Sequence, residues 1–206
     1  MKYNGPKCRL CRREGKKLFL KGDRCTSQKC AVVRRNTLPG KGEGKMSSKL
    51  SEYGKQLREK QAAKRIFGIS EKQMSNYYER ATNLKGIAGE NLLLLLEMRF
   101  DNIIYRSGLS SSRSQARQMV SHKTFLINGK RSNVASIRIK KKDVITFKKE
   151  DLSQLSLERS KNNSKMIPKW ISVDFKSKKI EITRLPELEE LENSINPHLI
   201  IEFYSL

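Results

Sequence analysis

The sequence predicts an α+β protein with three parts: an N-terminal metal knuckle, a mostly helical domain, and a small α/β module inserted into that domain. Three observations support this fold class. All four cysteines lie within residues 8–30. Apolar residues recur at helical spacing between about residues 49 and 108. Residues 124–147 instead alternate between apolar and polar types, as β-strands do.

The predicted domains follow these changes of pattern, and the bounds of the inserted module are those implied by a family resemblance that is given below with its residues. Residues 1–45 form the knuckle and a basic connector, and residues 97–157 form the inserted module. The helical domain comprises residues 46–96 and is completed by residues 158–206. We expect the apolar C-terminal segment to pack back on this domain, because water disfavours exposed apolar surface.

The charge of the chain is strongly positive and unevenly distributed. Its 206 residues include 44 lysines and arginines against 21 acidic residues, a formal net charge of +23. Residues 180–206 contain six acidic residues and one arginine, a net charge of −5 that leaves +28 for residues 1–179. Self-repulsion would oppose folding of so basic a chain unless a polyanion neutralised it. The basic part therefore predicts a nucleic-acid surface.

The four cysteines have the spacing of a metal site. Cys8 and Cys11 form one close pair, Cys25 and Cys30 form another, and thirteen residues separate the pairs. Two such pairs can supply four thiolates to a tetrahedral zinc ion, so one zinc per chain is the predicted cofactor. An iron–sulfur cluster and free or redox-active thiols are the alternatives. Four thiolate ligands leave no open coordination position, which indicates a structural metal.

The cellular compartment is predicted from the absence of signal-peptide and membrane-spanning patterns in the sequence. The start of the chain has no apolar run of the kind found in a signal peptide. The five leucines at residues 92–96 are far fewer than the roughly 20 residues that span a bilayer. We therefore expect a cytoplasmic protein without membrane contact. Thiols stay reduced in that compartment, which favours metal binding over disulfides.

Several helices are predicted before the module. Residues 36–48 are rich in glycine, serine and lysine and predict a connector. A helix follows and ends at Gly68. Ser70 and Gln73 predict a capping box for the next helix. Residues 91–108 then predict a single buried helix.

The module itself is predicted to begin with a helix that presents arginines. Ser111 or Ser112 caps this helix, and Arg113 and Arg117, four residues apart, share one of its faces. The strands that follow carry further basic residues at their turns, namely Lys130, Arg131 and Lys140–Lys142. Such an arrangement suits contact with the phosphates of an RNA backbone.

Turn residues divide the rest of the chain. Tight turns are predicted at Asn128-Gly129 and over Lys140–Asp143. Residues 168–186 predict further short strands, residues 185–195 predict an acidic helix, and an apolar segment ends the chain.

The sequence contains no recognisable catalytic constellation. Its two histidines, His122 and His198, belong to no metal-ligand or nucleophile motif. His122 precedes a lysine of the module and is a candidate RNA contact, whereas His198 is assigned a structural role. We therefore predict that the protein is not an enzyme.

The whole chain resembles one family in a fixed order of segments. It is similar to the bacterial-type uS4 family of small-subunit ribosomal proteins in CRLCRREG, SEYGKQLREKQ, NYYERATNLKGIAGENLLLLLEMRFDNIIYR, SRSQARQMVSHK, INGKRSN and the ending HLIIEFYSL. The resemblance implies a structural constituent of the small ribosomal subunit. Such a protein binds 16S rRNA as a primary binder and nucleates subunit assembly.

The resemblance also implies further partners. The inserted module would be the S4-type RNA-binding domain, and basic residues after the knuckle would line the channel through which mRNA enters the subunit. The C-terminal part would contact the neighbouring small-subunit protein uS5, at an interface tied to translational accuracy. The acidic character of residues 180–206 suits a protein partner better than RNA.

The predicted RNA-binding residues combine the charge pattern with this resemblance. Those of the module are assigned to rRNA and those of the connector to the mRNA channel. The full set is Arg12, Arg13, Lys16 and Lys17 beside the cysteines; Lys41, Lys45 and Lys49 in the connector; Arg58, Lys60, Lys64 and Arg65 in the first long helix; and Arg99, Arg113, Arg117, His122, Lys123, Lys130 and Arg131 in the module.

The chain departs from the usual family pattern at two places. The family often has PGQHG after the knuckle, where this chain reads PGKGEG. The family's module often has Gly-Asp where Lys142-Asp143 stands. Some members lack the four cysteines, so the resemblance does not make the metal essential to the fold of the family.

Two other classes of function compete with the ribosomal one. An RNA-modifying enzyme with the same module needs a catalytic domain of roughly 100 residues or more, and the chain after residue 157 is too short to hold it. A zinc-dependent DNA-binding regulator needs a recognition helix beside the metal, whereas the residues after Cys30 lead into the connector.

Overall fold

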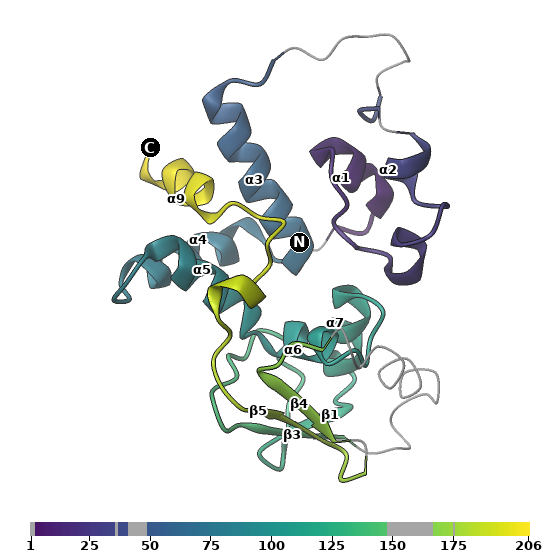
Figure 1. The fold of residues 1–206 in the computed structure, drawn as a ribbon, viewed down its shortest axis with the longest axis vertical. Helices are drawn as coiled ribbons and strands as arrows, with labels where there is room; N and C mark the ends of the chain where they lie inside the picture. The colour runs from purple at the N-terminus through teal and green to yellow at the C-terminus, as the bar shows by residue number, and fades with distance from the viewer. Residues whose placement is uncertain (1–2, 36, 41–48, 148–166, 175) are drawn as a thin grey trace. The chain divides into compact units, whose positions relative to one another are not determined.

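The structure is a computed structural model that describes residues 3–35, 37–40, 49–147, 167–174 and 176–206. The chain divides into two compact units, whose elements are labelled in Figure 1. The first unit combines Met1–Leu92 with Asn193–Leu206, and the second is the continuous stretch Leu93–Glu192. Within the described residues no helix is long and apolar enough to cross a membrane.

The first unit is built from helices whose ends follow local sequence signals. Helix α3 (Glu52–Phe67) ends at Gly68, whose φ of 62° suits a residue without a side chain. Helix α4 (Glu71–Thr82) starts with the predicted capping box of Ser70 and Gln73. The other described helices of this unit are α1 (Lys7–Glu14), the 3₁₀ turn η1 (Gly22–Cys25), α2 (Ala31–Arg34), α9 (Pro197–Ser205) and α5 (Ala88–Glu97), which continues into the second unit.

The C-terminal helix α9 packs against α3 within the first unit, as Figure 1 shows. The ring centroids of Tyr53 and Phe203 lie 5.5 Å apart. Tyr78, from α4, stacks on Tyr204 with the ring centroids 4.8 Å apart. Ile200 of α9 is fully buried. The prediction that the apolar C-terminus packs back on the helical domain is confirmed.

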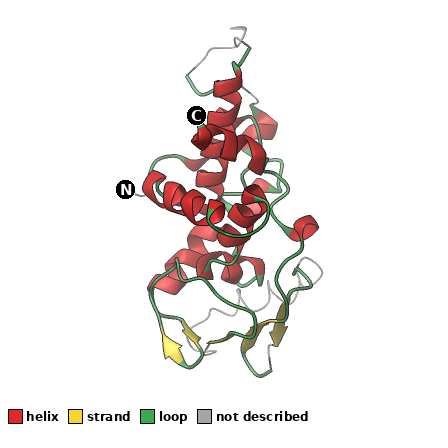
Figure 2. Cartoon of the chain, turned by 90° about the vertical axis from the view of Figure 1, so that its left-hand side faces the viewer, coloured by secondary structure: helices red, strands yellow, loops and turns green. Residues whose placement is uncertain are grey.

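The second unit packs two helices, α6 (Phe100–Arg106) and α7 (Arg113–Ser121), on an antiparallel sheet. Its core includes the fully buried Trp170, Phe125 and Ile180. Figure 2 shows the strands in yellow and the helices in red. The strands are β1 (Phe125–Ile127), β2 (Lys130–Arg131), β3 (Val144–Phe147), β4 (Ile171–Asp174) and β5 (Lys179–Ile182), in the order β2-β1-β3-β5-β4.

The pairing of β3 with β5 changes the predicted domain boundary. Ile145 of β3 lies opposite Ile180 of β5, so the predicted strands of residues 168–186 complete the sheet of the module. The sequence prediction assigned all of residues 158–206 to the helical domain, but only Asn193–Leu206 joins the first unit. The reason is the alternation of apolar residues in β4 and β5, which gives them a buried face continuous with that of β3.

The prediction of one buried helix over residues 91–108 is wrong. Helix α5 ends at Glu97, Arg99 is extended with ψ of 142°, and α6 begins one residue later. The backbone at this break pairs with a distant segment instead of continuing the helix. The N–H of Ile139 donates to the carbonyl of Met98 at 2.9 Å, and Arg99 forms an isolated bridge with Arg138.

Local turn predictions of the second unit are confirmed, but the acidic helix is not. Ser112 caps α7 by accepting a hydrogen bond from the N–H of Gln115. Asn128 and Gly129 make the turn between β1 and β2. In place of the acidic helix over residues 185–195 there is a single 3₁₀ turn, η3 (Leu188–Glu190), after which the backbone is extended.

Candidate nucleic-acid interface

The basic residues predicted to bind RNA differ sharply in how the fold uses them. Some are buried or paired with carboxylates, and others are exposed. Since a cation already neutralised by a carboxylate gains less from a phosphate, this division decides which residues form a candidate interface.

Arg99 lies in the interior of the second unit and is not a surface residue. Its side chain is 1% exposed and forms a two-pronged hydrogen bond with Asp101, at 3.0 Å and 2.8 Å. Arg117, on α7, lies 3.8 Å from the same carboxylate. The prediction that Arg99 contacts RNA is therefore wrong in this fold, because the start of α6 buries the guanidinium among the core residues.

Arg113 is held by neighbours on three sides. Its Nε donates to Asn102 at 2.7 Å, and a second guanidinium nitrogen lies 2.6 Å from Glu192. The guanidinium also stacks over the Tyr105 ring at 4.6 Å. Only 11% of the Arg113 side chain is exposed. This geometry fixes the arginine as part of the scaffold that holds α6 and α7 together.

Arg106 was missed by the sequence prediction and belongs to the same network. It donates to both oxygens of the fully buried Glu97, at 3.1 Å and 2.7 Å, and lies 3.6 Å from Glu192. Burial alone would lower the pKa of Arg106, but the two carboxylates outweigh that effect and raise it above its usual range. No sequence signal pointed to this pair, because residues 91–108 were predicted as one continuous helix.

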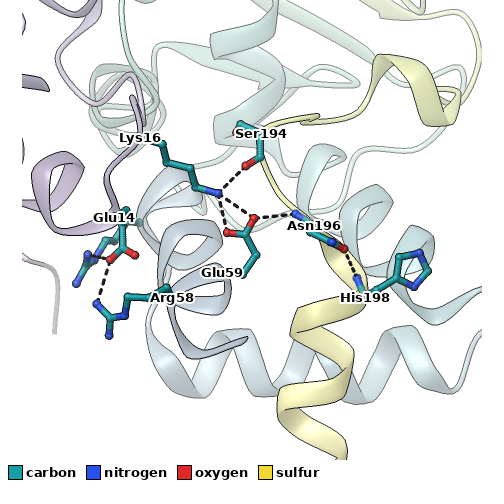
Figure 3. A network of polar contacts seen from close by, with 8 residues as sticks. Glu14, Lys16, Arg58, Glu59, Ser194, Asn196 and His198 are labelled. Atoms are coloured by element: carbon teal, nitrogen blue, oxygen red, sulfur yellow. Dashed lines mark hydrogen bonds and ion pairs between the residues drawn. The ribbon is translucent and has the colours of Figure 1, made fainter. Parts of the chain in front are cut away.

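Two basic residues of α3, Arg58 and Arg65, converge on one carboxylate of the knuckle. Glu14 is 1% exposed, and its Oε1 accepts hydrogen bonds from Arg58 at 3.3 Å and from Arg65. Figure 3 shows Glu14 and Arg58 pointing toward each other. Burial raises the pKa of Glu14 despite these guanidiniums. Both arginines therefore fasten α1 to α3.

Lys16 connects three segments of the first unit (Figure 3). Its Nζ lies 2.6 Å from the Glu59 carboxylate on α3 and donates to the backbone carbonyl of Ser194 at 2.7 Å. The same carboxylate accepts from the N–H of Asn196 at 3.0 Å. Lys16 thus joins the cysteine segment to the start of α9 through Glu59.

Lys60 and Lys64 share the carboxylate of Glu71. Their Nζ atoms lie 2.6 Å and 2.9 Å from it, and the Tyr204 hydroxyl donates to it at 2.9 Å. Lys60 is 5% exposed and also lies over the Phe203 ring at 4.1 Å. Because Lys60 is buried, its ammonium group is not placed for direct contact with RNA. This corrects the prediction that Lys60 binds RNA.

The other predicted residues are lysines and arginines that are mostly exposed, together with His122. Within the described residues none of them forms an ion pair. Arg12 is half-buried and donates to the backbone and hydroxyl of Thr37. Lys41 and Lys45 lie outside the described residues. The half-buried Lys17 and the exposed Arg13, Lys49, His122, Lys123, Lys130 and Arg131 complete this group.

Further exposed lysines lie at or beside the turns of the sheet in the second unit. Lys140, Lys141 and Lys142 belong to the turn that was predicted to present charge to RNA. Lys176, Lys178 and Lys179, which lie before or at the start of β5, were not predicted, although they form a lysine-rich run in the sequence.

The cysteines gather in one segment of the first unit. Cys11, Cys25 and Cys30 are buried and Cys8 is half-buried, all as free thiols. Burial raises the pKa of Cys11, the Leu18 backbone lowers it, and the charges of the other three thiolates raise it further. The N–H of Lys21 lies 3.3 Å from the Cys25 sulfur. Among the described side chains, however, no three cysteines, histidines or carboxylates are arranged to hold a metal ion.

The thiols have the chemistry that a soft metal needs, but among the described residues their positions do not form a ligand group. A metal knuckle is not part of the fold that the structure shows. The remaining α+β organisation, a helical unit and a unit with a small antiparallel sheet, agrees with the prediction.

Comparison with known proteins accounts for nearly the whole chain. Residues 2–97 match the family described as "Ribosomal protein S4/S9 N-terminal domain", and residues 98–145 match the "S4 domain". The chain belongs to the uS4 family of ribosomal proteins. This is a family of ribosomal proteins and not of enzymes.

Curated members of the uS4 family align with the chain over almost their full length. The small ribosomal subunit protein uS4 of Clostridium beijerinckii is 49% identical over 204 residues, with 99% of this chain and 98% of the relative covered. That of Clostridioides difficile (strain 630) is 48% identical over 206 residues, with 99% of both covered. The protein uS4A of Clostridium perfringens (strain 13 / Type A) is 48% identical over 204 residues.

Proposed function

We propose that this chain is a structural constituent of the small ribosomal subunit that binds 16S rRNA as a primary binder and nucleates assembly of the subunit. As part of a ribosome it works in the cytoplasm. The observation that carries the proposal is the set of exposed, unpaired cations in the part of the chain that the structure describes, on a chain whose whole length matches the uS4 family. These cations can neutralise phosphates without breaking the ion pairs that hold the fold together.

Binding of a 16S rRNA fragment tests this function. The fragment should carry the five-way junction of the 5′ domain, and a duplex DNA of equal charge should serve as competitor. We expect the RNA to be preferred and its affinity to fall steeply with salt, because phosphate contacts release counterions. Preference for the DNA would contradict the proposal.

Two further contacts belong to this function. Lys41, Lys45 and Lys49 would meet mRNA in the channel through which it enters the subunit, and the exposed Lys49 is available for that contact. The acidic residues around η3, among them Glu187 and Glu189, would face protein uS5 and influence translational accuracy. A crosslink from this segment to uS5 in assembled subunits would support the contact, and crosslinks to rRNA alone would contradict it.

We also propose one zinc ion held by Cys8, Cys11, Cys25 and Cys30. The support is the chemistry of four clustered thiols, their burial, and the backbone N–H that points at the Cys25 sulfur. Bound zinc would require the thiols to close up from their present positions and would stabilise this segment alone. About one zinc per chain after anaerobic purification would support the site. Iron with a visible charge-transfer band would indicate a cluster, and no metal would leave free thiols.

A further inference from the structure

Three lysines of the second unit adopt a backbone conformation that side chains disfavour. Lys123, Lys142 and Lys178 have φ angles of 59°, 71° and 56°. In this left-handed region the Cβ atom crowds the following carbonyl, so glycine is the residue of lowest cost there. The sequence nevertheless has a lysine, and not a glycine, at each of these three turns.

The fold requires each of these turns. Lys123 lies between α7 and β1, and its N–H donates to the carbonyl of Val120 at 2.9 Å. The N–H of Lys142 donates to Ile182 at 3.1 Å, and the carbonyl of Lys178 accepts from Phe147 at 3.2 Å. These hydrogen bonds fix the backbone conformation at each turn. They do not explain why the residue there is lysine instead of glycine.

The other described non-glycine residue with positive φ in this unit, Asn128, has a local explanation. Asparagine tolerates the left-handed region better than most residues. Its side chain accepts from the N–H of Val144 at 3.0 Å and donates to Asp143 at 2.9 Å. The three lysines have no comparable hydrogen bond from their side chains among the described contacts, and all three side chains are exposed.

The carboxylates close in sequence to Lys142 and Lys178, those of Asp143 and Asp174, are already used by the turns. Asp143 accepts from the N–H of Lys140 at 2.7 Å as well as from Asn128. Asp174 accepts from the Ser177 hydroxyl at 2.6 Å and from the N–H of Lys176 at 2.8 Å. Both acids therefore stabilise backbone geometry, and no ion pair within the described residues neutralises Lys142 or Lys178.

We propose that Lys123, Lys142 and Lys178 contact RNA phosphates, and that the turns of the sheet carry the RNA-binding charge of the second unit. The inference rests on the proposed function and reassigns its contacts within this unit. Arg99 and Arg113, two of the RNA contacts predicted for the module, instead hold the unit together. Lys142 belongs to a turn that was predicted to present charge to RNA, whereas Lys178 lies outside the predicted residues and outside those matched by the S4 domain.

The test separates the backbone role of these residues from their charge. A variant with Lys123, Lys142 and Lys178 all replaced by glycine relieves the strained turns and removes three positive charges. We expect a melting temperature no lower than that of the unchanged protein. We also expect the log–log salt slope of rRNA binding to become shallower by roughly 2 to 3, at about 0.7–0.9 for each phosphate contact. At 0.1 M salt this corresponds to about a sixfold loss of affinity for each contact.

Two control variants complete the design. Glutamine in place of Lys72, Lys85 and Lys169 removes the same charge from exposed lysines elsewhere and should leave the slope nearly unchanged. Arginine in place of the three turn lysines keeps the charge and should retain binding. If the glycine variant melts early, asparagine at the same positions gives a second variant that tolerates the conformation without the charge.

The outcomes are distinct. A glycine variant that binds with the affinity and slope of the unchanged protein overturns the inference, and so does an equal loss in the glutamine control, which would mean that only net charge matters. Failure of the unchanged protein to prefer the rRNA fragment would overturn the proposed function itself. That failure is recognised before any variant is compared.

Discussion

Replacing Glu71 by glutamine should destabilise the first unit, because this carboxylate balances a buried ammonium. Lys60 Nζ lies 2.6 Å from Glu71, and only 7% of the Lys60 side chain is exposed. Glutamine keeps the size of the side chain and removes its charge. Lys60 would then keep a neutral amide oxygen and the Phe203 and Tyr204 rings as neighbours, but would lose the negative charge that Glu71 supplies.

The size of the effect follows from the exposure of the two partners. Removing one partner of a fully buried pair costs about 3–5 kcal/mol. Glu71 is 48% exposed, so water screens the pair and the cost falls toward the roughly 1 kcal/mol of surface pairs. Glu71 is also the first residue of α4, where a negative charge contributes about 0.3–1 kcal/mol. We expect a loss of about 2 kcal/mol and a melting temperature lower by about 4–8 °C.

The pH dependence gives the effect a second signature. Burial raises the pKa of Glu71, but hydrogen bonds from Lys60, Lys64 and Tyr204 outweigh it and lower the pKa from 4.5 to about 2. Since the folded value lies below the unfolded one, the carboxylate stabilises the fold fully above pH 4.5. That contribution is lost as the pH falls toward 2. The difference in stability between the unchanged protein and the Glu71→Gln variant should therefore disappear at low pH.

Urea unfolding followed by circular dichroism measures this gap across the pH range. Glu79→Gln is the matched control, because Glu79 is exposed on the same helix and its carboxylate accepts only from Ser75, at 3.5 Å, among the described contacts. Equal destabilisation by the two substitutions at neutral pH would refute the reasoning. A difference in stability that is unchanged at low pH would contradict the stabilising role assigned to the Glu71 charge.

Three other substitutions test the second unit. Trp170→Ala removes a fully buried ring and should cost about 3–5 kcal/mol in urea unfolding followed by circular dichroism; a loss below 1 kcal/mol would contradict its place in the core. Ser112→Ala removes the cap of α7 and should cost about 1 kcal/mol in the same assay, whereas Ser111→Ala should cost less. Glu192→Gln weakens the pair with Arg113 and should lower the melting temperature while the salt slope of rRNA binding stays the same. A steeper slope would show that releasing Arg113 creates a new phosphate contact.

Element ends were predictable from sequence where a few neighbouring residues determine them. The cap at Ser70, the stop at Gly68 and the turn at Asn128-Gly129 each depend on side chains within about four positions. The break at Arg99 could not be found in this way. Its cause is backbone pairing with Arg138, which only the folded chain brings near. The pairing of β3 with β5 is non-local for the same reason.

The candidate interface, too, could be predicted from the sequence only in part, because it depends on contacts between distant segments. The net charge correctly predicted a polyanionic partner. It could not show which of the cations form ion pairs within the protein. Arg113 meets Glu192, and Lys16 meets Glu59, across long stretches of sequence. The lysine at position 142, noted as a departure from a common glycine, takes a conformation that glycine would favour. Only the backbone angle gives that departure a physical meaning.

The division of the first unit into two chain segments has a consequence for synthesis. Helix α3 buries apolar residues against α9, which belongs to the last residues made. At about 5–20 residues per second, translation of the second unit delays α9 by roughly 5–20 s. Strands β4 and β5, which complete the sheet of the second unit, are also made late in that interval. Until α9 is made, α3 lacks the helix against which it packs, so the first unit cannot reach its final packing before the end of the chain is synthesised.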